Sequence, residues 1–216
     1  MKIKNITLII LIPILILLGN FAFLAFNENY YKEQYIKNNV YTRIPKEEVD
    51  KATTELSDYL QFGKEMQSDY FNEKEKLHLK DVRQIIRILL IILYIAVMLS
   101  TIIIIISYAE NKKLLGMSII GGSLLTIALI ILAFIILQNF EYAFIKFHEI
   151  LFTNDLWLLN PRTDKLIVMF PENFFYDITQ DIAFRSLLTA IATTAIGWLL
   201  LLGKKTKHHS KVKRNN

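Results

Sequence analysis

Apolar residues are gathered in four nearly charge-free stretches along the chain. They cover residues 6–26, 85–108, 114–137 and 182–202. A helix needs about 20 mainly apolar residues to cross the hydrocarbon core of a bilayer, and each stretch reaches that length. The pattern predicts an all-α polytopic membrane protein with four transmembrane helices. The first stretch is longer than the apolar part of a signal peptide, about 7–15 residues, and therefore predicts an uncleaved anchor.

The connection over residues 27–84 predicts helical elements in a small cap. Pro45 precedes two acids and an apolar stripe of helical spacing, and Gly63 suits the end of that helix. Asn72 and Glu75 then have the spacing of a capping box. Nothing after them breaks a helix before the second span, so His78 is expected about 15 Å before the apolar stretch proper, at 1.5 Å per residue.

The connection over residues 138–181 predicts the second part of the cap. Five residues at helical spacing, Phe140, Phe144, Phe147, His148 and Leu151, extend the third span as one apolar face. Farther on, the run KLIVMF lies between turn residues and favours a short strand or an extended segment. We therefore expect His78 and His148 at similar depth under one cap.

Charge predicts how the chain lies in the membrane. Lysines flank the first span at its N-terminal side, fill the short second connection, and crowd the basic tail over residues 203–216. Because lysine and arginine favour the cytoplasmic side, both termini are predicted inside, and the cap segments 27–84 and 138–181 outside. Residues 1–216 then form a single membrane domain. The net charge of +5 reflects these flanks, so the expected partners are membrane lipids and not nucleic acid.

Composition excludes several kinds of chemistry. The chain has no cysteine, which rules out a thiol nucleophile or a CxxC redox site on it. No Walker or Rossmann glycine pattern supports a nucleotide. The spans lack a central charge or a pair of broken helices, which makes a transporter the weakest reading.

The two histidines outside the tail, His78 and His148, are the candidates for proton transfer near neutral pH. His148 also has a structural explanation as a core histidine with one hydrogen-bond partner, and His78 has one as an ordinary polar residue beside the membrane. A metal site built from His78, Asp81, His148 and Glu149 is a weak alternative, because no HExxH or similar cluster is present. The aromatic residues of the second connection suit either a membrane-interface belt or a pocket for acyl chains.

Two stretches resemble the lipoprotein intramolecular transacylase family: EKLHLKDV before the second span, and FHEILFTNDLWLLNPRTDKLIVMFPENFFYD after the third. The resemblance implies four spans with an extracellular cap in a bacterial cytoplasmic membrane. It also implies a reaction on diacylglyceryl-modified lipoproteins, in which the sn-2 acyl chain moves to the α-amino group of the N-terminal cysteine. By the same resemblance, His78 and His148 form the catalytic pair. The change from ester to amide is downhill, so no cofactor is expected.

Further residues are expected to line the pocket or orient the histidines. They are Asp81, Phe144, Phe147, Glu149, Phe152, Trp157, Arg162 and Glu172. The sequence leaves open which histidine is the base. The apolar setting of His148 favours it for this role, because desolvation keeps the imidazole neutral. Two other functions also stay open: an acyltransferase or hydrolase acting on phospholipid, and a non-enzymatic membrane sensor whose histidines titrate.

Overall fold

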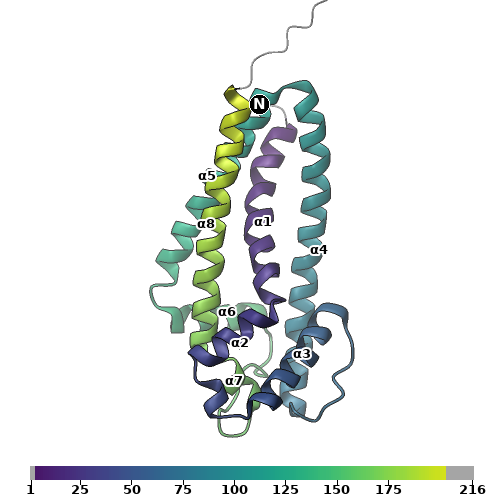
Figure 1. The fold of residues 1–216 in the computed structure, drawn as a ribbon, viewed down its shortest axis with the longest axis vertical. Coiled ribbons are helices and arrows are strands. Elements are labelled where there is room, and N and C mark those ends of the chain that lie inside the picture. The colour runs from purple at the N-terminus through teal and green to yellow at the C-terminus, as the bar shows by residue number, and fades with distance from the viewer. Residues whose placement is uncertain (1–2, 203–216) are drawn as a thin grey trace, which may run out of the picture.

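Four long helices form a bundle, and shorter helices gather at one end of it (Figure 1). The computed structural model describes residues 3–202. The long helices are α1 (Ile3–Ala25), α4 (Glu73–Glu110), α5 (Lys112–Ile136) and α8 (Glu172–Leu202). Each is long and apolar enough to cross a membrane. The predicted fold class, an all-α membrane protein with four transmembrane helices and a small cap, is confirmed. The basic tail predicted over residues 203–216 lies outside the described residues.

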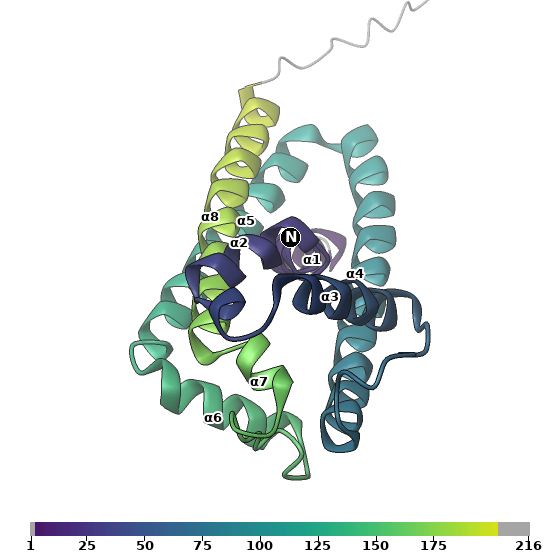
Figure 2. The ribbon, with the colours of Figure 1, turned by 60° about the horizontal axis from the view of Figure 1, so that its bottom comes forward.

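The cap holds α2 (Glu28–Lys37), the 3₁₀ turn η1 (Val40–Thr42), α3 (Lys46–Phe62), α6 (Phe140–Leu151) and α7 (Lys165–Met169). Figure 2 shows these elements brought forward at the end of the bundle away from the N-terminus. The helix predicted after Pro45 is confirmed as α3, and it ends at Gly63, whose φ of 76° favours glycine. Helix α2 was not predicted, because its sequence is largely polar and its buried tyrosines leave no clear stripe.

Two predictions for the second connection are wrong. Helix α5 does not run on into the next segment: it ends at Ile136, and α6 starts anew with Asn139 accepting the backbone N–H of Tyr142. The run KLIVMF forms the short helix α7 and its C-cap, and the described residues contain no strand. Leu166 and Met169 of α7 are buried in the cap core, so burial of an apolar face decided this local structure.

The cap has an apolar core of its own, which a chain without disulfides requires. Residues of α2, η1, α3, α4 and α7 contribute to it: Tyr35, Val40, Val49, Ala52, Leu56, Phe71, Leu79, Leu166 and Met169. Leu79 is the neighbour of His78 on α4, so the first turns of this helix belong to the cap and its later turns to the bundle.

Within the bundle, α5 and α8 approach each other closely at Gly116 and Gly197. A Cβ atom added at Gly116 would lie 2.6 Å from the carbonyl oxygen of Gly197, and one added at Gly197 would lie 2.9 Å from the carbonyl oxygen of Gly116. Farther along, the hydroxyls of Ser123 and Thr193 lie 2.8 Å apart. Helices in lipid associate by such contacts between small and hydroxyl-bearing residues, because apolar burial alone gives no advantage there.

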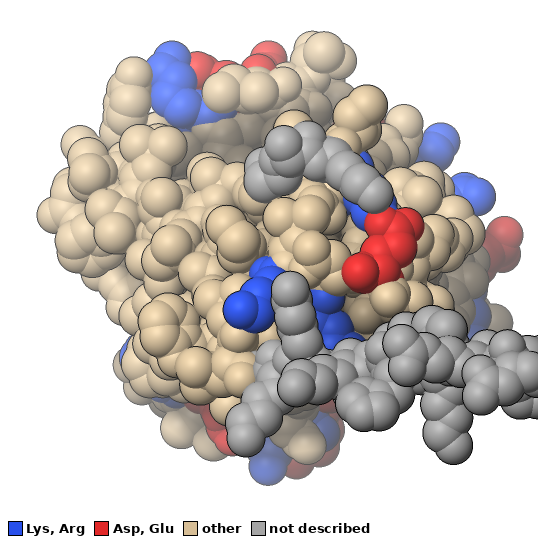
Figure 3. All heavy atoms as spheres, turned by 90° about the horizontal axis from the view of Figure 1, so that it is seen from above, with Lys and Arg blue, Asp and Glu red and all other residues tan. Residues whose placement is uncertain are grey.

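Charged side chains of both signs lie at the opposite end of the bundle. Figure 3 views this end and shows basic and acidic side chains close together near its centre, with uncharged ones around them. An ion pair of 2.6 Å between Lys4 and Glu110 joins α1 to α4 here. The N-terminus and the α4–α5 connection thus share one end, as an even number of spans requires.

Glu75 ties the start of α4 to α7. This buried carboxylate accepts the backbone N–H of Asn72 at 2.7 Å, which completes the predicted capping box, and accepts the backbone N–H of Leu166 at 2.6 Å. The side chain of Asn72 in turn donates to Asp164, the residue before α7. The two parts of the cap, about 90 residues apart in sequence, are therefore joined one turn before His78.

The loop between α6 and α7 is attached to the same helix by two more hydrogen bonds. Lys74 donates to the backbone carbonyl of Leu158 at 2.5 Å, and Asn154 donates to Asp81 at 3.0 Å. Lys74 and Asp81 flank His78 on α4, so the loop is fastened on both sides of this histidine.

Substituting Glu75 with alanine should destabilise the cap by about 2–4 kcal/mol. The buried backbone N–H of Leu166 loses its acceptor, at about 1–3 kcal/mol, and the partly buried N–H of Asn72 loses a hydrogen bond worth about 0.5–1.5 kcal/mol. Thermal unfolding of the purified chain in detergent measures the effect. The matched control is Glu73→Ala, in the same turn with an exposed side chain, for which a change below about 0.5 kcal/mol is expected. Equal stability of the two variants would show that the Glu75 network does not hold the cap.

Substituting Gly116 with alanine should also lower the unfolding temperature, since the new methyl group meets backbone atoms of α8 that cannot move away separately. Such overpacking typically costs about 1–3 kcal/mol. Gly19→Ala is the control, because a Cβ there meets no atom within 4 Å. An unfolding temperature for Gly116→Ala at or above that of Gly19→Ala would contradict the close approach of the two helices.

Candidate active site

The fold brings His78 and His148 together from helices that are far apart in sequence. His78 lies on the first turns of α4, ahead of its apolar stretch, and His148 lies on the last turn of α6. Both are buried, with exposures of 7% and 8%, and their ring centroids are 6.4 Å apart. The expected joint placement of the two histidines is therefore seen in the geometry of the described residues.

Aromatic rings enclose His148 on several sides. Phe144 is centred 4.3 Å away, and Trp157 stacks on the imidazole at 5.0 Å. Phe147 and Phe152 complete the enclosure at 5.4 and 5.6 Å. Phe152 also lies edge-on to His78 at 5.1 Å, so one phenyl ring contacts both imidazoles. Four of the predicted pocket residues thus line one apolar wall.

The position of the His148 proton follows from one hydrogen bond. Nδ1 lies 2.7 Å from the backbone carbonyl oxygen of Phe144, and a carbonyl can only accept, so Nδ1 carries the hydrogen. In the neutral ring the lone pair is then on Nε2. Burial lowers the pKa of His148, and the Phe144 carbonyl opposes this shift by favouring the protonated ring. The ring is accordingly neutral at pH 7, with a basic Nε2.

His78 has a different environment. Its Nδ1 is buried and has no hydrogen-bond partner among the described residues. Burial is the main cause that lowers its pKa to about 4, and His148 and Lys74 act in the same direction, while Asp81 acts against them. A buried nitrogen without a partner costs about 1–3 kcal/mol of stability. A site that retains such a nitrogen is prepared for a ligand that supplies the missing partner.

The charged residues predicted for the site lie at its edges or farther away. Asp81 accepts the Asn154 side chain, and Glu149 pairs with Lys146 at 2.6 Å on the exposed side of α6. The orienting role expected of an acid is filled by the Phe144 carbonyl. Arg162 is exposed in the turn before α7 and lines a separate cavity of about 360 Å³, and Glu172 is exposed on the first turn of α8.

Sequence reasoning missed the residues that hold the loop over the histidines. Asn154 and the backbone carbonyl of Leu158 bind α4 from a loop whose sequence shows no periodic pattern. Glu75 was assigned a capping role, which is correct, but its second bond to Leu166 spans 91 residues. No local signal in the sequence indicates a contact of that range.

The metal alternative gains no support from the geometry. Within residues 3–202, no three His, Asp or Glu side chains come together as a metal site requires. What the arrangement offers is a neutral imidazole base and a second neutral imidazole about 6 Å away, between apolar walls that exclude water. Two such imidazoles can act in general acid–base catalysis on an apolar substrate.

The family model described as Lipoprotein intramolecular transacylase Lit matches residues 6–175. A structure of the membrane integral lipoprotein intramolecular transacylase Lit from Bacillus cereus superposes with a TM-score of 0.83 at 24% sequence identity, covering 92% of this chain and 94% of that one. Two structures of the same protein with one histidine substituted, by arginine or by alanine, give TM-scores of 0.78 at 24% identity. They cover 92% of this chain and 91% or 92% of theirs.

A search of curated proteins found no match. The likeness to the solved structures establishes the fold, and the family model spans more than three quarters of the chain. The chain is a multi-pass membrane protein and an acyltransferase, and it belongs to the lipoprotein intramolecular transacylase family.

Proposed function

We propose that this protein moves the sn-2 acyl chain of a diacylglyceryl-cysteine lipoprotein to the α-amino group of the same cysteine. The observation that carries the proposal is the pair of buried histidines 6.4 Å apart, one of them with its Nδ1 committed to a carbonyl. Family membership supplies the class of substrate. The cap then faces outward and both termini face the cytoplasm, as the placement of lysines favours.

His148 acts as the general base. An α-amino group has a pKa of about 8, so it needs to lose a proton before or during attack. The amine nitrogen attacks the ester carbonyl carbon, and His148 Nε2 takes the proton that the nitrogen gives up. A base near its substrate typically contributes a factor of about 10²–10⁴ to the rate.

His78 serves the oxygen atoms of the reaction. As a neutral imidazole it donates a hydrogen bond to the oxyanion of the tetrahedral intermediate. When the carbon–oxygen bond to glycerol breaks, the proton held by His148 passes to the departing glyceryl oxygen. Starting from the neutral amine, one carbon–nitrogen bond forms, one carbon–oxygen bond breaks, and the proton that leaves the nitrogen ends on the glyceryl oxygen. An amine that binds in its protonated form first releases one proton to solvent. The products are an N-acyl amide and a free glyceryl hydroxyl, the lyso form of the lipoprotein.

The aromatic wall contributes by positioning. The amine and the ester are joined by a flexible chain through the cysteine and the glycerol, so closing the ring costs conformational entropy. Phe144, Phe147, Phe152 and Trp157 form a surface against which the acyl and glyceryl groups pack. Holding the two ends together contributes up to about 7–11 kcal/mol in favourable cases.

Mass spectrometry of N-terminal lipopeptides tests the reaction. The protein is expressed in a bacterium that makes only diacylglyceryl lipoproteins, as the intact chain, as His148→Ala and as His78→Ala. We expect one acyl chain on the amine and one on the glycerol with the intact chain, and at least about 100-fold less of this product with either variant. Ile150→Ala, an 80% exposed position on α6, is the control that should keep full activity.

Two outcomes would reject the proposal. Full product with both histidine variants would exclude the mechanism. Unchanged diacylglyceryl peptides with the intact protein present in the membrane would exclude the reaction, and free fatty acid or lysophospholipid in that experiment would indicate a phospholipid enzyme instead.

Because burial keeps His78 neutral, we expect the stability of the folded chain to depend on pH. Its folded-state pKa of about 4 lies below the ordinary value of 6.5, so between these values the unfolded chain binds the additional proton. Folding stability that depends on neutral His78 is present above pH 6.5 and is lost as pH falls toward 4. The unfolding temperature of the intact chain should therefore drop more between pH 7 and pH 4.5 than that of His78→Leu. Equal drops would show that His78 is not held neutral by burial.

A further inference from the structure

A cavity of the described chain lies away from the histidines, between α1 and α8. It measures about 650 Å³, within the range of about 300–1,000 Å³ usual for small-ligand sites. Helix α1 and helix α8 supply ten of its twelve lining residues, and α4 and α5 supply Ile104 and Ile119. Neither histidine lines it, nor does any aromatic residue of the candidate active site.

The lining is polar at one end and apolar at the other. Arg185, Asn20 and Thr189 lie at the end nearer the cap, and Ile12, Ile119 and Ile196 lie toward the opposite end of the bundle. From Arg185 to Ile196, α8 rises through 11 residues, or about 16 Å. That length is close to half of the hydrocarbon core of about 30 Å, the depth of one leaflet. The cavity therefore has the length and polarity of one lipid chain below its headgroup.

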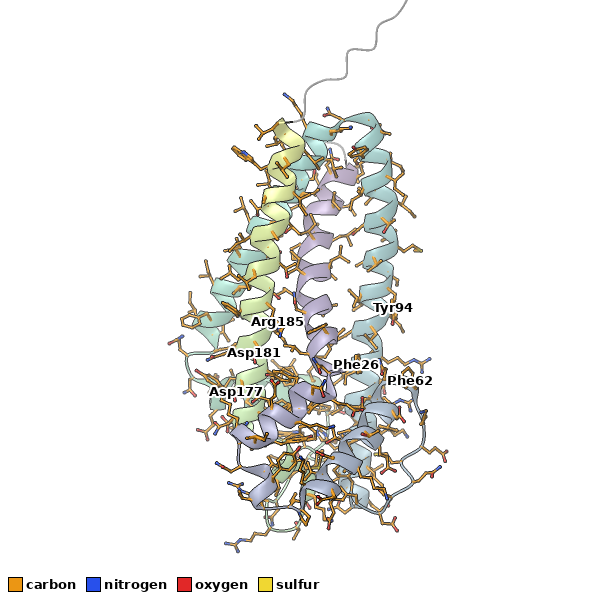
Figure 4. The ribbon with its side chains drawn as sticks, in the orientation of Figure 1. Phe26, Phe62, Tyr94, Asp177, Asp181 and Arg185 are labelled. Atoms are coloured by element: carbon orange, nitrogen blue, oxygen red, sulfur yellow. The ribbon has the colours of Figure 1, made fainter. Side chains whose placement is uncertain are left out.

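Arg185 lies within the apolar stretch predicted over residues 182–202 and forms no ion pair with a described residue, although Asp181 lies one turn before it on α8. Arg185 is exposed, makes no hydrogen bond or ion pair through its side chain within residues 3–202, and lies over the ring of Phe23 at 5.2 Å. Figure 4 shows Asp177, Asp181 and Arg185 in succession along α8, with Arg185 farthest from the cap. The two acids are occupied by α2: Asp177 pairs with Lys37 at 2.8 Å, and Asp181 accepts the hydroxyl of Tyr30 at 2.7 Å.

An ionisable side chain inside a membrane span is a candidate binding site, because leaving it unpaired in hydrocarbon is costly. The guanidinium group matches the oxygens of a phosphate, to which it donates two parallel hydrogen bonds. Asn20 adds a carbonyl oxygen, Oδ1, that accepts no hydrogen bond in the described part of the chain, while its amide donates to Ile16 and Thr189. A glycerol hydroxyl would suit this acceptor.

We propose that the cavity between α1 and α8 binds a membrane glycerophospholipid, with the phosphate on Arg185 and one acyl chain along the isoleucines of α1 and α8. The diacylglyceryl-cysteine of the proposed substrate carries esters, a thioether and an amine but no anion, so it does not match the guanidinium. The site is therefore separate from the active site, and the bound lipid belongs to the surrounding bilayer.

Native mass spectrometry of the full chain in non-ionic detergent tests this site. The intact protein is titrated with phosphatidylglycerol and, in parallel, with a diacylglycerol of the same chains that has no phosphate. We expect saturable binding of one phosphatidylglycerol. Arg185→Gln should weaken it at least about fivefold, as the loss of a charge-assisted contact predicts. Arg185→Lys keeps the charge but loses the two parallel hydrogen bonds, so its binding should lie between that of the intact chain and that of Arg185→Gln.

Two matched variants complete the experiment. Arg87→Gln removes an exposed arginine near the start of the apolar stretch of α4, outside the cavity, and should leave binding unchanged. Gly19→Leu fills space that the structure leaves open, since a Cβ there meets no atom within 4 Å, and should block the acyl chain without unfolding the bundle. Circular dichroism confirms the fold of each variant.

Three results would overturn the proposal. The first is phosphatidylglycerol binding that Gly19→Leu leaves unchanged. The second is equal binding to the intact chain and to Arg185→Gln. The third is diacylglycerol binding as strong as that of phosphatidylglycerol, which would make the cavity a neutral diacylglyceryl site. Acyl transfer is measured separately, so a failure of the proposed reaction would not affect this outcome.

Discussion

One buried carboxylate, that of Glu75, joins the parts of the molecule on which the candidate site depends. It caps α4, accepts a backbone N–H of α7, and lies one turn before His78. Without it, the segment that carries Trp157 would be held to α4 by the bonds of Lys74, Asp81 and Asn72 alone. The chain has no cysteine and so no disulfide could join these segments. A hydrogen-bonded carboxylate beside the apolar core of the cap joins them instead.

The sequence predicted the features that depend on local pattern. The four apolar helices, the Asn72–Glu75 capping box and the α3 boundary at Gly63 all follow from composition or from residues a few positions apart. The features it could not predict depend on contacts far along the chain. KLIVMF forms a helix because Leu166 and Met169 are buried by residues from α2, α3 and α4, and α6 separates from α5 at Asn139. Its resemblance to a known family named the two histidines, but not the carbonyl that fixes one of them.

The site around the histidines and the cavity between α1 and α8 differ in the chemistry that they suit. Around the histidines, aromatic rings and desolvation keep titratable groups neutral, which favours a neutral nucleophile and an ester. Between α1 and α8, an unpaired guanidinium favours an anion. A bilayer presents both kinds of lipid at the same depth, so this difference in charge separates substrate from surrounding lipid without a difference in shape.

The hydrogen bond from His148 Nδ1 to the Phe144 carbonyl has a consequence for how the site handles charge. A carboxylate in that place would strongly stabilise the imidazolium ion, whereas the carbonyl on the same helix fixes the direction of the ring and opposes only part of the effect of burial on its pKa. With aromatic rings on its other sides, a protonated His148 has no anion to rest against. In the proposed reaction, the ring would therefore carry a proton from amine to glycerol without storing it, and each turnover would leave His148 in the neutral state in which it started.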